Sequence, residues 1–194
     1  MVSLPPAPPA GYRPAVRFEY PMRSLHIISI VALVASFVGF GFIATQAQGR
    51  TLGELFSLNI FQILIILLLL PATILIHELM HGVTYQLLGY QVSYGIAPEL
   101  GAAYAAAFGQ FQQRQHNLIV ALMPLLVITG IGVIAMTIPA TPFLAAGAFV
   151  VLLINTSGAV GDVYITWRLL KMPPRTLLYD VSAAQMLIFE PASP

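Results

Sequence analysis

Four long apolar stretches run through this chain and restrict what it can fold into. They cover residues 25–45, 55–89, 117–138 and 142–170. Each is long enough to cross a bilayer, because a spanning helix needs about 20 apolar residues. Only 8% of the 194 residues are charged, whereas an ordinary soluble domain is about 25% charged. We therefore predict an all-α membrane protein with four transmembrane helices.

The second stretch contains the signals of a helix start and of a kink. Thr51-Leu52-Gly53-Glu54 has the residue types of a capping box, in which the Thr and Glu side chains satisfy backbone amides at a helix start. Pro71 removes a backbone hydrogen bond from the helix interior and is expected to kink it. Pro124 predicts a second kink near the start of the third helix. A tight turn at 138–142 separates the third helix from the fourth.

The distribution of Lys and Arg predicts an orientation. With four helices, the N-terminal segment, the loop after the second helix and the C-terminal segment lie on one side of the membrane. Seven of the eight Lys and Arg residues fall on that side, and Arg50 is the exception. Because cytoplasmic segments carry an excess of Lys and Arg, we expect both termini in the cytoplasm, at the plasma membrane. Residues 1–24 do not read as a cleavable signal peptide, so the first helix is expected to be retained.

The loop between the second and third helices has features of a β-hairpin. Residues 91–97 partly alternate between apolar and polar side chains, Pro98-Glu99-Leu100-Gly101 is a plausible turn, and residues 102–108 provide a return strand. We predict a membrane-associated hairpin because these residues are apolar enough to lie against the bilayer. The alternative is an irregular or partly helical interfacial loop.

Two histidines and a glutamate interrupt the second apolar stretch. In His77-Glu78-Leu79-Met80-His81 the histidines are four residues apart, so both lie on one face of a helix, and Glu78 can reach a water held there. This is the H-E-x-x-H arrangement of zinc hydrolases, with the glutamate as general base. Ionisable groups are costly in hydrocarbon and therefore point to function. Cysteine is absent, so a metal must be held by His and carboxylate groups, which suit zinc and several other divalent ions.

Asp162 is the predicted third ligand. A catalytic zinc usually has three protein ligands and a water, and Asp162 is the acidic residue of the fourth stretch. It lies about eight residues before the end of its helix, as His81 does, and the two helices run in the same direction. At 1.5 Å per residue both therefore lie about 12 Å from the cytoplasmic end.

Asn155 lies on the same stripe of the fourth helix as Asp162 and Thr166, seven residues before the first and eleven before the second. It could orient Asp162, or donate a hydrogen bond to a substrate main chain or to an oxyanion. His26 is expected to be interfacial or structural. His116 and Glu99 are expected to be solvated, and either would replace Asp162 if Asp162 is not a ligand.

These residues together resemble the site-2-protease-like intramembrane zinc metalloproteases and, within them, the putative zincin peptidase family. The resemblance covers roughly residues 55–170. It is carried by His77-Glu78-Leu79-Met80-His81-Gly82, by the Gly-containing loop that follows, and by Asn155 through Gly161-Asp162. One departure is that Val163 follows Asp162, where the larger site-2 proteases usually have Gly. An inserted PDZ-like domain does not fit in this length.

The resemblance implies that His77, His81 and Asp162 bind Zn²⁺ and that Glu78 is the catalytic base. It also implies that residues 91–108 offer a strand edge to the substrate. The implied function is hydrolysis of peptide bonds in or near transmembrane segments by a zinc-activated water. The expected partners are a membrane-protein or peptide substrate and the bilayer, and the net charge of +1 does not suggest nucleic acid. A metalloprotease-like domain at 25–171 would lie between cytoplasmic segments 1–24 and 172–194.

Two other functions compete with proteolysis. The first is a non-catalytic membrane scaffold or binding protein, whose structural metal site would be closed by a fourth ligand, with Asn155, Glu99 and His116 as the candidates. The second is transport of a metal or of protons, which is less favoured because the polar stripe is confined to one depth.

Overall fold

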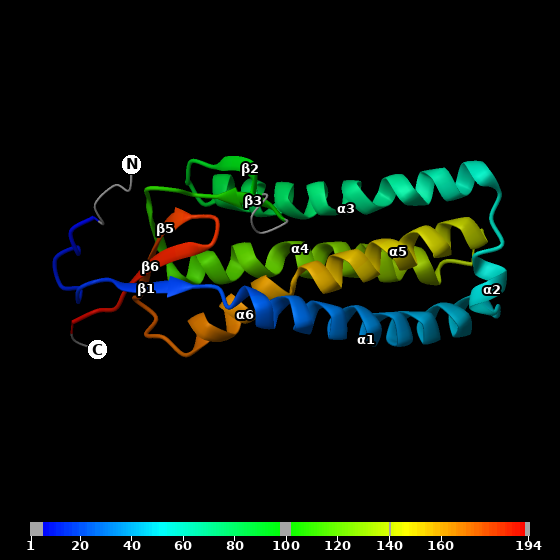
Figure 1. Ribbon diagram of the computed structural model, residues 1–194, viewed down its shortest axis with the longest axis horizontal. Coiled ribbons are helices and arrows are strands. Elements are labelled where there is room, and N and C mark those ends of the chain that lie inside the picture. The colour runs from blue at the N-terminus through cyan, green and yellow to red at the C-terminus, as the bar shows by residue number, and fades with distance from the viewer. Residues whose placement is uncertain (1–5, 98–101, 140, 193–194) are drawn as a thin grey trace.

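The computed structural model describes residues 6–97, 102–139 and 141–192. Long helices lie side by side, and the strands gather at one end of the molecule together with both ends of the chain (Figure 1). The helices of the described residues are α1 (Met22–Gln48), α2 (Leu52–Leu55), α3 (Ile60–Leu87), α4 (Arg114–Thr137), α5 (Pro142–Gly158) and α6 (Val160–Leu170).

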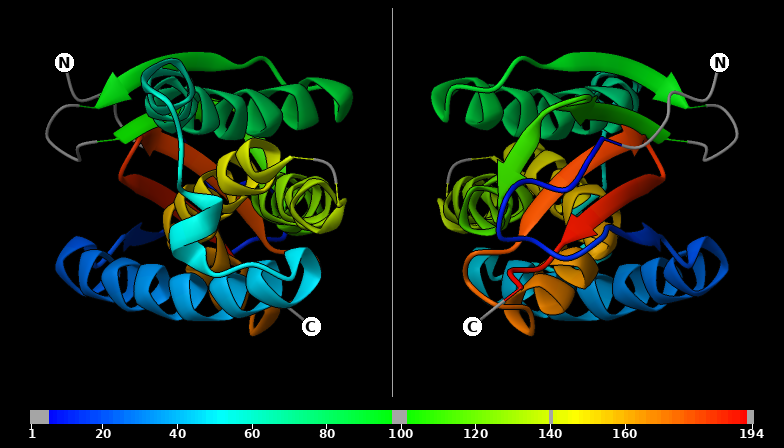
Figure 2. Two further views of the ribbon diagram at one scale, coloured as in Figure 1. Left: turned by 90° about the vertical axis from the view of Figure 1, so that its right-hand side faces the viewer. Right: turned by 90° about the vertical axis from the view of Figure 1, so that its left-hand side faces the viewer.

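Three of these helices, α1, α3 and α4, are each long and apolar enough to cross a membrane, and α5 with α6 forms a fourth span if the bent pair is counted as one. Large apolar side chains such as Phe42, Phe61 and Leu68 are exposed on the outside of the helices, on a surface that hydrocarbon can cover without cost. These three or four helices indicate a multi-pass membrane protein. Seen from its ends, the bundle has α4 and α5 between α3 and α1 (Figure 2).

The second predicted helix begins later than the sequence suggested. The capping box at Thr51 and Glu54 is present, but it caps the short helix α2, which ends at Leu55. A second capping box, formed by Asn59 and Gln62, begins α3. The α3 helix then continues unbroken through Pro71 to Leu87. Two consecutive capping boxes therefore separate an interfacial turn from the spanning helix.

The fourth predicted helix, residues 142–170, is divided in two. Its first part ends at Gly158, its second begins at Val160, and the two axes differ by 44°. Glycine is about 1 kcal/mol less favourable than alanine in a helix, so Gly158 and Gly161 weaken the helix on both sides of the break. Asp162 consequently lies in the first turn of α6 and not in the middle of a straight helix.

The predicted hairpin is confirmed. Strands β2 (Ser93–Ala97) and β3 (Ala102–Ala106) pair antiparallel, with Tyr94 opposite Ala105 and Gly95 opposite Tyr104. The predicted turn at residues 98–101, which includes Glu99, lies outside the described residues. The hairpin lies over the end of α3 that carries the motif (Figures 1 and 2).

The prediction of an all-α chain is wrong at the end of the molecule where the termini meet. Residues from the N-terminal segment, the loop before α4 and the C-terminal segment form an antiparallel sheet in the order β1-β6-β5-β4. Its strands are β1 (Val16–Glu19), β4 (Phe111–Gln113), β5 (Leu177–Ser182) and β6 (Gln185–Phe189). The N- and C-terminal segments are therefore built into the fold.

One apolar core joins this sheet to the helices. Phe18 of β1 and Met186 and Ile188 of β6 pack with Ala121 of α4 and Leu169 of α6, and all five are buried. Arg114 strengthens the junction, since its guanidinium donates hydrogen bonds to the carbonyl oxygens of Leu169 and Leu170 at the end of α6 (2.6 and 3.3 Å). Three distant segments of the chain thus cover the end of the bundle nearest the motif.

Candidate active site and metal centre

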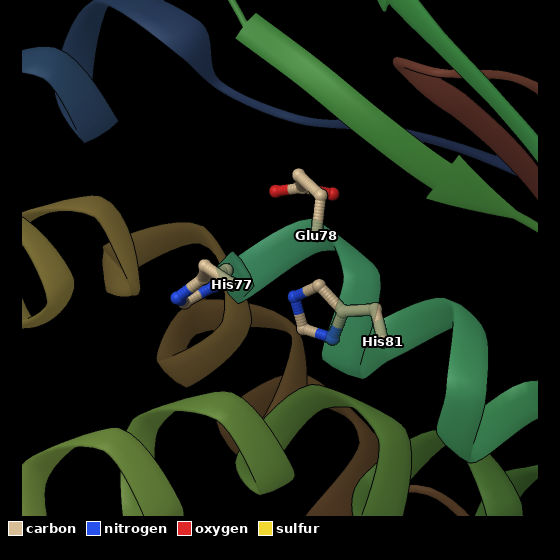
Figure 3. Close-up of side chains that lie close together, drawn as sticks. All are labelled: His77, Glu78 and His81. Atoms are coloured by element: carbon tan, nitrogen blue, oxygen red, sulfur yellow. The ribbon is translucent and has the colours of Figure 1, made fainter. Parts of the chain in front are cut away.

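The α3 helix presents both histidines of the motif on one buried face. His77 and His81 are each 7% exposed, and their ring centroids are 4.9 Å apart. Figure 3 shows both imidazoles directed toward the neighbouring helices, while the Glu78 carboxylate points to the other side, toward the hairpin strands. One ligand atom from each of the three side chains lies within 4.8 Å of the others.

Asp162 joins the two histidines from α6. Its Oδ2 lies 3.1 Å from His77 Nε2, and its Oδ1 lies 3.4 Å from His81 Nε2. The structure therefore brings together the histidines and the aspartate that the sequence indicated, and it directs both Nε2 atoms at one carboxylate. Glu78 also lies close enough to be counted as a ligand by distance, but its direction and its separate hydrogen bond make Asp162 the better third ligand.

The other nitrogen of each imidazole is held by a carbonyl oxygen. His77 Nδ1 lies 2.9 Å from Asn155 Oδ1, and His81 Nδ1 lies 2.9 Å from the Val120 carbonyl oxygen. Because a carbonyl oxygen only accepts, these contacts assign the proton to Nδ1 and leave the Nε2 lone pair free. Imidazoles that bind a metal are commonly oriented in this way. The donor set therefore fits a divalent metal ion such as zinc.

The hydrogen bonds of Asn155 favour one of the roles considered for it. It is 1% exposed, its Oδ1 faces His77, and its Nδ2 donates to Thr129 Oγ1 at 3.1 Å. Its hydrogen bond to His77 occupies the carbonyl group, and its hydrogen bond to Thr129 fixes which way the amide points. In this arrangement Asn155 orients His77, not Asp162. Neither end of the amide is directed at the two Nε2 atoms, which argues against a metal site closed by Asn155.

The remaining histidines lie apart from His77, His81 and Asp162. His116 pairs with the Tyr90 hydroxyl through Nδ1 at 2.8 Å, so it is engaged in the loop region. His26 is exposed on α1 and lines a cavity of about 340 Å³ that is described below. Neither therefore acts as a fourth ligand in this arrangement. His116 is half-exposed, and its ring packs edge-on against Tyr90.

Glu78 contacts the hairpin. Its Oε2 accepts a hydrogen bond from the Ala105 backbone N–H at 3.0 Å. The close approach of hairpin and helix depends on Gly82, because a Cβ at that position would lie 2.1 Å from the Tyr94 hydroxyl. The glycine that follows the motif therefore has a packing role: it lets the Tyr94 side chain of β2 pack against α3, beside the contact of β3 with Glu78.

Three cavities adjoin the site. The first, of about 150 Å³, is lined by Glu78, His81 and Asp162 together with residues of the β1-β6-β5-β4 sheet, which we call the terminal sheet. The second, of about 340 Å³, lies between α1, the hairpin and the α5–α6 break and also reaches Asp162. The third, of about 190 Å³, lies between α3 and α5 beside His77. Ala103 of β3 lines the second and the third, so the strand borders the space around the motif.

The terminal sheet adds two residues that the sequence did not indicate. Tyr20 and Asp180 both line the first cavity with Glu78, His81 and Asp162. Asp180 lies beside a bulge in β5, where the register shifts between Asp180 and Ser182, and bulges commonly re-aim side chains next to active sites. An acidic residue within the apolar run Leu177–Val181 was the available signal. No comparable signal marked Tyr20.

A buried polar network supports Asp180. Gln112 donates from Nε2 to Asp180 Oδ2 at 2.7 Å and accepts at Oε1 from Tyr85 and Asn117. Burial raises the pKa of the Asp180 carboxyl to about 6, although the hydrogen bond from Gln112 opposes that rise. Among the described residues that line the first cavity there is no Lys or Arg, so its three carboxylates leave the cavity suited to a cation.

Comparison with known families identifies the chain. Residues 67–177, which are 111 of the 194 residues, match the family described as "Putative zincin peptidase". The chain belongs to this family. The match includes the motif, the β2–β3 hairpin, Asn155 and Asp162, and it ends at the first residue of β5, so Tyr20 and Asp180 lie outside it. No curated protein and no solved structure matches the chain.

Proposed function

We propose that this zincin-family protein is an intramembrane zinc metalloprotease of the site-2-protease-like kind. It would hydrolyse peptide bonds in or near transmembrane segments of membrane proteins. The observation that carries the proposal is the meeting of His77 Nε2, His81 Nε2 and the Asp162 carboxylate between apolar helices, with Glu78 beside them. A set of metal ligands next to a free carboxylate base, inside apolar helices, is difficult to explain by packing alone.

His77, His81 and Asp162 would hold the zinc, and Asn155 would keep His77 in its binding orientation. A bound zinc ion polarises the scissile carbonyl and lowers the pKa of a bound water toward about 7. Glu78 would take a proton from the attacking water as the water oxygen bonds to the carbonyl carbon. It then returns the proton to the amine that leaves. Glu78 lines the first cavity with His81 and Asp162 while it accepts the hydrogen bond from the Ala105 N–H.

The free edge of β3 is the proposed substrate-binding strand. Ala105 lies opposite Tyr94 in the hairpin register, yet its N–H donates to Glu78 and not to β2. This edge therefore faces the motif. A transmembrane helix must unwind before its scissile bond is accessible, and addition of the unwound segment to a strand edge would hold it extended. Bound along β3, the segment would pass beside Glu78 and the metal ligands.

The same arrangement supports a proposed orientation and a proposed division of the chain. The sheet lies at the end of the bundle that carries both termini (Figure 1), and all Lys and Arg residues except Arg50 belong to the segments predicted on that side. We therefore place that end, and the site near it, toward the cytoplasm, at the plasma membrane. Residues 25–171 would be the catalytic domain, and residues 1–24 and 172–194 would contribute the strands that cover it.

Substitution of Glu78 tests the proposal. Wild-type protein, reconstituted in vesicles with labelled transmembrane peptides, should contain about one zinc per chain and cleave a subset of the peptides. Glu78→Gln should keep the zinc and lose cleavage, because only the proton transfer is removed. Glu19→Gln is the matched control, since Glu19 is exposed on β1 and should cleave at the wild-type rate. Cleavage by purified Glu78→Gln at the wild-type rate would refute this mechanism.

A further inference from the structure

Tyr20 is fixed in place between the terminal sheet and α1. Its backbone N–H donates to the Ala184 carbonyl oxygen at 3.4 Å, and its carbonyl oxygen accepts from the Met22 N–H at 2.8 Å. Its ring packs edge-on against Phe18, with centroids 5.2 Å apart, and lies 6.4 Å from the ring of Tyr164. The position of the side chain is therefore set by the packing of the sheet on α6.

The Tyr20 side chain lies where two of the cavities meet. It lines the 150 Å³ cavity with Glu78, His81 and Asp162, and it lines the 340 Å³ cavity with Asp162 and Tyr104. Burial raises the pKa of the Tyr20 phenol, and the nearby Asp162 and Asp180 carboxylates raise it further. A tyrosine phenol has an ordinary pKa of about 10, so the hydroxyl is protonated at neutral pH and can donate a hydrogen bond.

Several neutral side-chain donors beside the site have partners elsewhere. The Tyr85 hydroxyl donates to Gln112, the Asn117 amide donates to Gln112, and the Gln185 amide donates to Glu19. Asn155 donates to Thr129.

Among the described tyrosines on the cavity walls, Tyr20 and Tyr104 then remain, while the Ser182 hydroxyl accepts a hydrogen bond from the Ala184 N–H. The Tyr104 hydroxyl lies against Gly95 of β2, 2.5 Å from where a Cβ of that residue would be. The Tyr20 hydroxyl has no hydrogen-bond partner among the described side chains and backbone groups. Of the two, Tyr20 comes from outside the hairpin, and it lines the cavity that Asp162 and Ala103 of β3 also line.

We propose that the Tyr20 hydroxyl donates a hydrogen bond to the oxygen of the attacked carbonyl group. This inference rests on the proposed function. As the water oxygen bonds to the carbonyl carbon, the water proton goes to Glu78 and the carbonyl π electrons move onto the carbonyl oxygen. The C–N bond then breaks, and the proton passes from Glu78 to the amine. A phenol placed beside the developing negative charge stabilises the transition state more than the ground state.

The proposal gives the N-terminal segment a catalytic purpose. Tyr20 lies outside the span that matches the family, and the pairing of β1 with β6 is what holds it over the site. Two roles that the sequence left open for Asn155, orienting a ligand and binding the substrate oxygen, then fall to two different residues. Asn155 orients the imidazole of His77, and Tyr20 binds the substrate oxygen.

The test compares Tyr20→Phe with wild type and with Tyr164→Phe. Tyr164 is the matched control because its ring lies beside Tyr20 and it does not line the first or second cavity. Loss of one oxyanion donor typically lowers kcat by about 10²–10³. We expect that loss in Tyr20→Phe, with unchanged zinc content, unchanged thermal stability and little change in KM. Tyr164→Phe should keep the wild-type kcat.

Binding measurements separate this role from a structural one. A phosphinic peptide resembles the tetrahedral transition state, so its affinity should fall in Tyr20→Phe by about the factor lost from kcat. Affinity for the uncleaved peptide, measured in the Glu78→Gln background, should stay the same. Wild-type kcat in Tyr20→Phe, or loss of zinc in parallel with activity, would overturn the Tyr20 role alone. Absence of Glu78-dependent cleavage in wild type would overturn the proposed function and this inference together.

Discussion

The two helical regions that supply the proposed ligands position them in different ways. The α3 helix contains Pro71 and yet continues to Leu87, so the two histidines keep the fixed four-residue spacing of a helix. The α5–α6 region breaks at Ala159 and bends by 44°, so Asp162 begins a new helix. A continuous helix sets the separation of two ligands, and a bend turns the third toward them. Proline in one helix and glycine in the other do not by themselves predict which is broken.

The largest effect should come from the bent region. Asp162→Ala removes the one side chain that contacts both His77 and His81, so zinc should fall from about one equivalent to near zero, as it should in His81→Ala. Metal analysis of the purified variants measures this directly. Asp180→Asn is the control, because Asp180 lines the same cavity but contacts neither histidine. Unchanged zinc in Asp162→Ala would remove the third ligand.

A smaller effect is expected where the two regions touch. Asn155 of α5 holds His77 of α3 through one hydrogen bond, and loss of such an outer partner typically weakens metal binding about 10- to 100-fold. Asn155→Ala should show a loss in this range in competition with a zinc chelator of known affinity. Thr129→Val, which removes only the partner of the Asn155 amide, should weaken binding less. Equal affinities in Asn155→Ala and wild type would refute the orienting role.

The pH dependence of stability should reveal the buried carboxyl of the terminal sheet. The pKa of Asp180 is raised from 3.8 to about 6, so between those pH values the folded protein keeps a proton that the unfolded chain has lost. The contribution of the Asp180 carboxyl to the free energy of unfolding is therefore greatest below about pH 4. It falls by roughly 3 kcal/mol as the pH rises to 6. Thermal unfolding across this range should show the fall.

Asp180→Asn should remove that pH dependence. The asparagine oxygen can still accept the hydrogen bond from Gln112, and the amide has no charge to bury. The variant should therefore be more stable than wild type above pH 6. A wild-type slope between pH 4 and 6 in Asp180→Asn would assign the dependence to another group.

Replacement of Gly82 by alanine should disturb the contact between the hairpin and α3. Gly82→Ala places a Cβ 2.1 Å from the Tyr94 hydroxyl, and overpacking of this kind costs about 1–3 kcal/mol. Because the clash displaces the hairpin, cleavage should fall while zinc is retained. The double variant Gly82→Ala with Tyr94→Ala should recover most of the loss. Full activity of Gly82→Ala alone would show that the hairpin position does not depend on this contact.

Gly161→Ala should have the smallest effect. A Cβ at Gly161 meets nothing within 4 Å, and alanine favours a helix by about 1 kcal/mol over glycine. Thermal stability should therefore be equal or slightly higher than in wild type. A marked loss of stability would mean that the bend between α5 and α6 depends on glycine at this position.

The parts of the fold that could be predicted are those encoded locally. Apolar length indicated the spans, alternation indicated the hairpin, and spacing indicated the face shared by His77 and His81. The position of Asp162 was accessible because depth in a membrane follows from counting residues along helices that run in the same direction. The bend at Ala159 was missed because the whole stretch is apolar, and the packing of neighbouring helices decides where such a stretch breaks.

The parts that could not be predicted depend on pairing between distant segments. Strand β1 pairs with β6, so Phe18 lies opposite Met186, although 168 positions separate them in the chain. Strand β1 has no partner near it in sequence, and β6 has only β5. Short strands are stable only when they are paired and packed. Tyr20 and Asp180 reach the cavity through this sheet, so the sequence could mark Asp180 as an acidic residue in an apolar run but could not assign either residue to the site.

X-ray absorption spectroscopy at the zinc edge, on wild-type protein and Glu78→Gln, tests the central claim most directly. The account predicts one zinc per chain with two imidazole nitrogens at about 2.0–2.1 Å, the remaining ligands being oxygen. One of those oxygens is exchangeable, and the spectrum should be the same in Glu78→Gln, because Glu78 is the base and not a ligand. A site without imidazole nitrogen, or one whose first shell changes when Glu78 is replaced, would contradict it.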